Sequence, residues 1–105
     1  MEDYLIDFKN MDWESPSVGV RYKAYIRNHH KIRLAEFTEE FVEEDWCTKG
    51  HTGYIVEGSL SIDFNGMLTN LRAGDGLFIP EGEEHKHKAK VAKGEKALVI
   101  LFEQC

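Results

Sequence analysis

The sequence contains few of the residues that mark a secreted or membrane-bound protein. Its 105 residues include two cysteines, Cys47 and Cys105, which are too few and too far apart for a disulfide framework. No apolar run approaches the roughly 18 residues of a membrane-spanning helix. The first residues, MEDYLIDFKN, carry acids where a signal peptide carries lysines and an unbroken apolar segment. These absences predict a cytoplasmic protein without a membrane partner.

Positive charge is also in short supply. The chain has 13 lysines and arginines against 19 acids, for a net charge of −6. Most of such a surface repels polyanions, so we expect no nucleic-acid partner. The one basic concentration is residues 86–96, where Lys86, Lys88 and Lys90 alternate and would share one face of a strand. Lysines on an exposed strand discourage edge-to-edge pairing, which is sufficient reason for their presence.

What the sequence has in abundance is short strands. Leu60, Ile62 and Phe64 alternate with polar residues, and the Asn65-Gly66 dipeptide that follows favours a tight hairpin turn. The same pattern predicts strands at residues 18–26, 31–36, 52–57, 59–64, 67–71, 76–79, 86–91 and 97–102. Closely spaced short strands with turns between them are typical of a β-sandwich or barrel.

The length is that of one domain. We expect the barrel to occupy residues 18–105, with residues 1–17 as an N-terminal arm or edge strand. Residues 38–44 fit a short helix as an alternative, because the neighbouring apolar residues recur at helical spacing.

Two histidines end the stretch GDGLFIPEGEEHKH, residues 74–87. If residues 86–91 form a strand, His85 and His87 lie on one face with Ala89 and Val91. That face is apolar and therefore interior. An imidazole among apolar residues needs a hydrogen-bond partner or a metal ion.

A second group of potential ligands lies earlier, where Asp45, Cys47 and His51 fall within seven positions. Carboxylate, thiolate and imidazole groups all bind transition metals. Other interpretations stay open: Cys47 as a small buried apolar residue, Asp45 as part of an acidic run, or Cys47 and His51 as a nucleophile and its base.

Together the two stretches resemble the motifs of the cupin superfamily. The second motif, G-x5-P-x-G-x2-H-x3-N, is present as Gly74, Pro80, Gly82 and His85, with Ala89 in place of the final asparagine. The first motif, G-x5-H-x-H-x3,4-E-x6-G, can be aligned on Gly58. His51 then stands at the glutamate position, Cys47 and Asp45 at the two histidine positions, and Glu39 at the opening glycine.

The resemblance implies an all-β fold, the double-stranded β-helix or jelly-roll cupin barrel. It also implies metal ligands at His51, His85, Cys47 and Asp45. That donor set favours a divalent transition metal such as Zn or Fe, with Ni and Mn less favoured. His87 would orient His85 or replace a weak ligand, and Tyr54, Trp46 and Phe78 would line an apolar pocket.

The implied function is binding of a small molecule, with a candidate divalent metal in the barrel. If the protein is an enzyme, the family's repertoire suggests a metal-dependent dioxygenase, isomerase, epimerase or lyase. The alternatives are a metal-free ligand-binding or sensing domain, and a dimeric interaction module without catalysis. Cupins of this size commonly form homodimers, which we also expect here.

Overall fold

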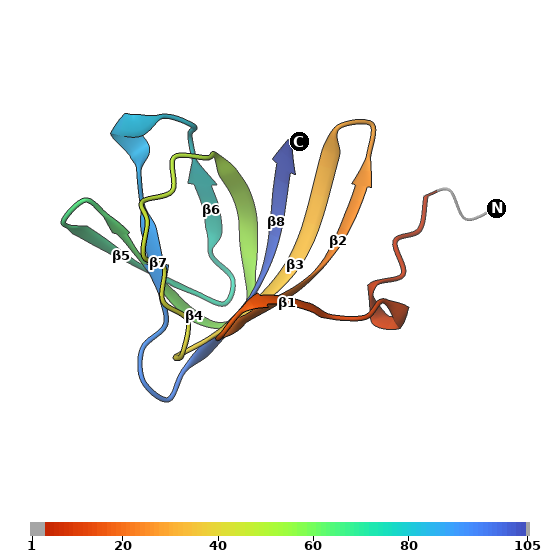
Figure 1. Ribbon diagram of the computed structural model, residues 1–105, viewed down its shortest axis with the longest axis horizontal. Coiled ribbons are helices and arrows are strands. Elements are labelled where there is room, and N and C mark those ends of the chain that lie inside the picture. The colour runs from red at the N-terminus through yellow and green to blue at the C-terminus, as the bar shows by residue number, and fades with distance from the viewer. Residues whose placement is uncertain (1–3, 105) are drawn as a thin grey trace.

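The computed structural model describes residues 4–104 and is almost entirely β-structure (Figure 1). Its elements in chain order are η1 (Phe8–Asn10), β1 (Glu14–Ser17), β2 (Val20–Arg27), β3 (His30–Thr38), β4 (His51–Phe64), β5 (Met67–Arg72), β6 (Gly76–Ile79), η2 (Glu83–His85), β7 (Lys88–Lys90) and β8 (Lys96–Gln104). Each expected strand has a counterpart, and the two expected at 52–57 and 59–64 are joined in β4. The all-β prediction is therefore confirmed. No helix among the described residues is long and apolar enough to cross a membrane.

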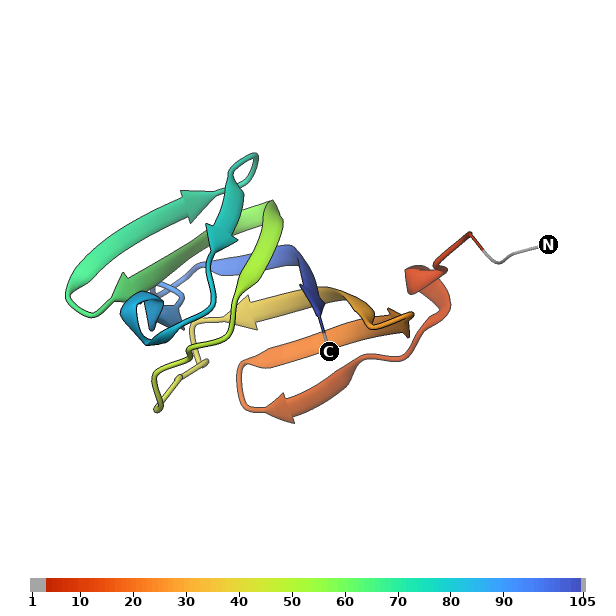
Figure 2. The same cartoon turned by 90° about the horizontal axis from the view of Figure 1, so that it is seen from above.

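All strand pairs are antiparallel, in the order β1-β2-β3-β8-β4-β5, and β6 and β7 both pair with β4. The sheet curls, so that β5 and β7 lie on one side of the molecule and β2 and β3 on the other (Figures 1 and 2). The long strand β4 joins the two sides. Its first part, from His51 to Tyr54, pairs with β6 and β8, and its last part, from Ser59 to Phe64, pairs with β5.

A register shift between Ile55 and Glu57 interrupts the pairing of β4 with β8, and it lies between the part of β4 that pairs with β6 and the part that pairs with β5. Gly58 lies just beyond it with φ +79°, and a Cβ built there would be 1.8 Å from the carbonyl oxygen of Lys96. Only glycine allows this close approach of β4 and β8. The turn at Asn65-Gly66 has positive φ at both residues, as the expected hairpin requires.

The core lies inside the curled sheet. Ile55 on β4 and Val99 on β8 are completely buried and face each other across the pairing of the two strands. Burying an aliphatic side chain of this size contributes roughly 1.5–3 kcal/mol. Ala35, Leu60, Ile62, Ile79 and Leu101 are among the residues that complete this core.

Residues 38–44 do not form the helix that was considered as an alternative. Thr38 ends β3, and a turn at 39–40 leads into an irregular segment. Phe41 packs edge-on against Phe37, with 5.0 Å between ring centroids, and so contacts the core without a helix. The helical spacing of Phe37 and Phe41 therefore reflects a contact between two side chains at the end of β3.

Candidate metal centre

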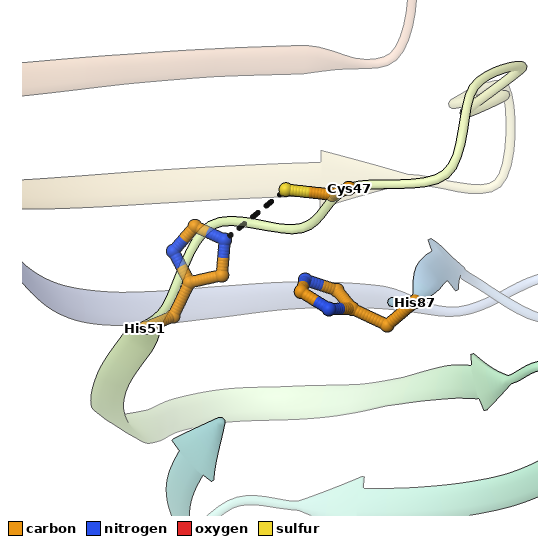
Figure 3. Close-up of side chains that lie close together, drawn as sticks. All are labelled: Cys47, His51 and His87. Atoms are coloured by element: carbon orange, nitrogen blue, oxygen red, sulfur yellow. Dashed lines mark hydrogen bonds between the residues drawn. The ribbon is translucent and has the colours of Figure 1, made fainter. Parts of the chain in front are cut away.

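Three potential metal ligands meet inside the curled sheet: Cys47, His51 and His87 (Figure 3). One donor atom from each lies within 4.8 Å of the other two. His51 is the first residue of β4, Cys47 lies in the segment that leads into it, and His87 directly precedes β7. His87 is buried, with 4% of its surface exposed, and the other two are partly buried.

The backbone holds Cys47 and His87 side by side. Their residues form an isolated antiparallel bridge, with hydrogen bonds of 2.9 Å from the Cys47 amide to the His87 carbonyl and 3.0 Å in the reverse direction. Gly82 also donates its amide to the Thr48 carbonyl at 3.0 Å. These bonds tie the turn of residues 80–82 to the segment that carries Cys47. Backbone hydrogen bonds alone therefore hold the two distant stretches together.

The orientation of His87 is fixed by the carbonyl group of His85. The Nδ1 atom of His87 lies 3.0 Å from that oxygen. A carbonyl only accepts, so Nδ1 carries the proton and Nε2 of a neutral ring keeps its lone pair. His87 also packs against His51 and Phe64, with ring centroids 5.3 and 5.9 Å away. His87 is therefore held as a preorganised Nε2 ligand.

His51 is oriented in the same manner by a carboxylate. Its Nδ1 atom lies 2.7 Å from Glu103 Oε2, while its Nε2 atom points to Cys47 Sγ at 3.6 Å. The same oxygen of Glu103 accepts a hydrogen bond of 2.9 Å from Arg33 Nη2. Burial opposes ionisation of Glu103, but the hydrogen bond from His51 and the charge of Arg33 outweigh it and lower its pKa to about 2. The ionised carboxylate keeps the proton of neutral His51 on Nδ1, so that Nε2 is available as a ligand.

The separation of Cys47 and His51 is compatible with a tetrahedral ion. Bonds of about 2.3 Å to sulfur and about 2.0 Å to nitrogen at a tetrahedral angle place the two ligand atoms roughly 3.5 Å apart. The Cys47 Sγ to His51 Nε2 separation is 3.6 Å. Three protein ligands also leave a fourth position of a tetrahedral ion for a water or a bound molecule.

The three side chains line a cavity of about 990 Å³. Phe37, Leu60 and Val99 contribute to its apolar wall, and Arg33 and Glu103 are among its polar lining. A largely apolar cavity with a few converging polar groups is the usual form of a small-molecule site.

Two residues predicted as ligands lie outside the cluster. His85 belongs to the short helix η2, so the strand alternation that would place its side chain beside His87 does not reach it. It contributes a carbonyl oxygen instead. Asp45 has an exposed side chain. Among the described residues, the group within mutual ligand distance consists of Cys47, His51 and His87.

The three aromatic residues expected in the pocket do not line this cavity. Phe78 and Tyr54 point away from the interior and are 77% and 49% exposed, because Ile79 and Ile55 occupy the inward positions of their strands. Trp46 lies beneath two lysines, with the Lys88 ammonium 4.8 Å from its ring centroid. Phe37 and Phe41 line the cavity in their place.

Arg33 and Glu103 were not among the predicted site residues. Both lie in strands of ordinary alternating pattern, far from either motif, and meet through the pairing of β3 with β8. The sequence does carry one local indication. Arg33 and Glu103 are charged, yet each stands two residues from a buried apolar residue of its strand, Ala35 and Leu101 respectively. A charge on the apolar face of a strand calls for a partner.

Comparisons with known proteins establish the class. No family model matches the sequence. The polyketide cyclase RemF of Streptomyces resistomycificus has a similar structure, with a TM-score of 0.80 and 15% identity over 96% of this chain and 78% of that one. An RmlC-like cupin from Shewanella frigidimarina is similar as well, with a TM-score of 0.73 and 20% identity over 98% of this chain and 92% of that one. The chain has the cupin jelly-roll fold, as its two motifs predicted.

One known protein is similar to this chain in sequence. The uncharacterized protein YdbB of Bacillus subtilis (strain 168) is 37% identical over 65 residues, which are 61% of this chain and 58% of that protein. The match thus spans less than two thirds of the relative's length.

Proposed function

We propose that this protein binds a divalent transition-metal ion through Cys47, His51 and His87, and holds a small molecule beside it in the cavity. The observation that carries the proposal is the orientation of the two imidazoles. Each donates Nδ1–H to an oxygen that accepts only, so the Nε2 atom of each neutral ring keeps a lone pair with which it can bind an ion.

The donor set supports Zn²⁺ or Fe²⁺ as the ion. One thiolate and two imidazoles suit borderline cations and disfavour Mg²⁺ and Ca²⁺, which prefer oxygen ligands. When bound, such an ion supplies Lewis acidity that polarises an oxygen of the ligand or of a water. Around it, Glu103 holds the proton of His51 on Nδ1, and the His85 carbonyl does the same for His87. The apolar wall, to which Phe37, Leu60 and Val99 contribute, would contact the rest of the bound molecule.

Elemental analysis of the purified protein tests the proposal. We expect about one zinc or iron per chain, or its uptake after reconstitution of protein treated with a chelator. Absence of a stoichiometric metal in both preparations would contradict the proposal.

A metal-free binding protein is the second candidate. It is favoured by the 3.6 Å contact between Cys47 and His51, which satisfies both side chains without an ion. A thermal-shift screen separates the two candidates, because a ligand at about 100 times its Kd stabilises a protein by about 2.7 kcal/mol. Ligand stabilisation that survives a strong chelator supports the metal-free candidate, and stabilisation that needs added metal supports the first.

We also propose that two copies pair through the outer face of the sheet formed by β2, β3, β8, β4 and β6. The register places eight apolar side chains on this face, in rows that Thr52 interrupts between Phe102 and Phe78: Tyr25, Ile32, Leu34, Leu98, Ile100, Phe102, Tyr54 and Phe78. Three of them, Phe78, Tyr54 and Phe102, are 77%, 49% and 46% exposed.

A second copy fits this face better than a charged partner. Within the part of the chain that the structure describes, the middle of this face is formed by Ile32, Leu34, Ile100 and Phe102, while Lys23, Glu36 and Glu57 lie toward its margins. Two such faces can therefore meet around a two-fold axis with their charges at the rim. Five strands span about 24 Å, and a patch that buries about 800 Å² per partner is roughly 30 Å across. The face is close to the size that a stable pair needs. Light scattering tests the pairing.

A cytoplasmic location belongs to the same proposal. A metal-binding thiolate must stay reduced, and the cytoplasm keeps cysteines in that state.

A further inference from the structure

Arg33 is a cation in the wall of the cavity whose hydrogen-bonding capacity is not used up. It lies on the inward side of β3, its side chain is 20% exposed, and it lines the cavity. Its Nη2 atom donates to Glu103, while its buried Nε atom has no hydrogen-bond partner among residues 4–104. Leaving a buried N–H group unpaired is unfavourable, so a ligand that pairs the guanidinium fully is favoured.

A second cation lies next to Arg33. Lys31 precedes it by two residues on the same strand, so both side chains point inward, and Lys31 also lines the cavity. Both lie near the ring of Tyr22, with the Arg33 Cζ atom 5.4 Å and the Lys31 Nζ atom 5.9 Å from its centroid. The ring limits where the two cations can move. Together they form a positive corner in a protein whose net charge is −6.

The acids that line the cavity leave this corner positive. Glu103 is already shared between Arg33 and His51. Glu43 accepts a hydrogen bond of 2.7 Å from the Ala89 amide, on the opposite side of the barrel. Glu81 has an exposed side chain in the turn after β6.

One atom connects this corner to the metal ligands. Glu103 Oε2 accepts from Arg33 Nη2 at 2.9 Å and lies 2.7 Å from His51 Nδ1. The guanidinium and the imidazole are thus separated by a single oxygen. A small molecule in the cavity can reach both.

We propose that Arg33, assisted by Lys31, binds the carboxylate of the cavity's ligand, which is a small organic acid. This inference rests on the proposed function, because a second oxygen of the acid, a hydroxyl or carbonyl, lies toward Cys47, His51 and His87. A guanidinium suits a carboxylate because its planar donors match the two oxygens. The ligand class is therefore a hydroxy or keto acid of low molecular mass.

Calorimetric titration of the zinc-reconstituted protein with malate tests the proposal, with the uncharged diamide of malate as the matched control ligand. We expect the wild-type protein to bind malate at least tenfold more tightly than the diamide. Arg33→Gln weakens malate binding at least tenfold, and Lys31→Gln weakens it less. Lys90→Gln removes the same charge from the exposed end of β7 and leaves binding unchanged.

Zinc content measured on the same samples separates this inference from the proposed function. If the protein does not bind zinc but its malate binding still depends on Arg33, the carboxylate site is supported and the proposed metal site is contradicted. Equal binding of malate and its diamide, or no binding of either, overturns the inference even if zinc is bound. If Arg33→Gln does not fold, the inference is tested with Lys31→Gln and Arg33→Lys. Unchanged malate affinity in both variants overturns it too.

Discussion

The inner and outer faces of the sheet formed by β2, β3, β8, β4 and β6 differ in how their side chains are paired. On the inner face, polar groups contact one another in a continuous chain from Arg33 through Glu103 and His51 to Cys47. On the outer face, apolar side chains such as Tyr54 and Phe78 are left largely exposed. This difference is the basis of two of the proposals above, a small ligand on the inner face and a second copy of the chain on the outer face.

Removal of the inner ligands is expected to have the largest effect. Cys47→Ala, His51→Ala and His87→Ala each delete one of three ligands, so we expect zinc affinity to fall by at least two orders of magnitude. His85→Ala and Asp45→Ala are the controls, since neither side chain belongs to the cluster. Competition with a chromogenic chelator measures the affinity. Loss of zinc in His85→Ala but not in His87→Ala would show that the ligand is His85, the histidine of the cupin motif.

Neighbouring residues of β4 offer a direct comparison of a core position and an exposed one. Ile55 is completely buried, whereas Val56 is 41% exposed. Ile55→Ala leaves a cavity in the core and is expected to lower the free energy of unfolding by about 2–5 kcal/mol. Val56→Ala is expected to cost less than about 1 kcal/mol. Urea denaturation measures both, and similar costs would show that the inner face is not the core.

The outer face is tested by a charge at its centre. Tyr54→Lys places an ammonium group on the middle of the face, opposite Ile100. We expect a mass by light scattering that falls from two chains to one, with zinc content unchanged. Lys90→Gln, far from the face, should leave the mass at two chains. A wild-type mass of one chain would remove the proposed pairing.

Acid stability reports on the pairing of Glu103. Its pKa is about 2 in the folded protein against an ordinary value of 4.5. The lowered pKa means that its contribution to stability is present above about pH 4.5 and is lost as the pH falls toward 2. In metal-free protein, Glu103→Gln should be less stable than the wild type at pH 6, with a difference that shrinks on acidification. A difference independent of pH would contradict this account of the carboxylate.

The fold was predictable because its signals are local. Alternation in Leu60, Ile62 and Phe64 and the Asn65-Gly66 turn each determine a strand or a reversal without reference to the rest of the chain. The helical spacing around residues 38–44 was ambiguous for the same reason. A contact such as Phe37 with Phe41 depends on the end of a strand, which spacing alone does not reveal.

The site was predictable only in part. Cys47 and His51 follow from the first motif, but the choice between His85 and His87 depends on where a strand begins. Because His85 lies in the helix η2, its side chain does not follow the alternation of a strand, and three residues are too few for the sequence to show a helical period. Arg33 and Glu103 meet across a pairing of residues 70 positions apart, which a single sequence does not display.

The central claim is that Cys47, His51 and His87 bind one metal ion together. The absorption spectrum of the protein reconstituted with Co²⁺ tests it most directly, because thiolate ligation and tetrahedral geometry each produce a characteristic band. The account predicts intense visible bands of a tetrahedral site and a sulfur-to-cobalt charge-transfer band that Cys47→Ser abolishes. A weak octahedral spectrum without the charge-transfer band, unchanged in His87→Ala, would contradict it.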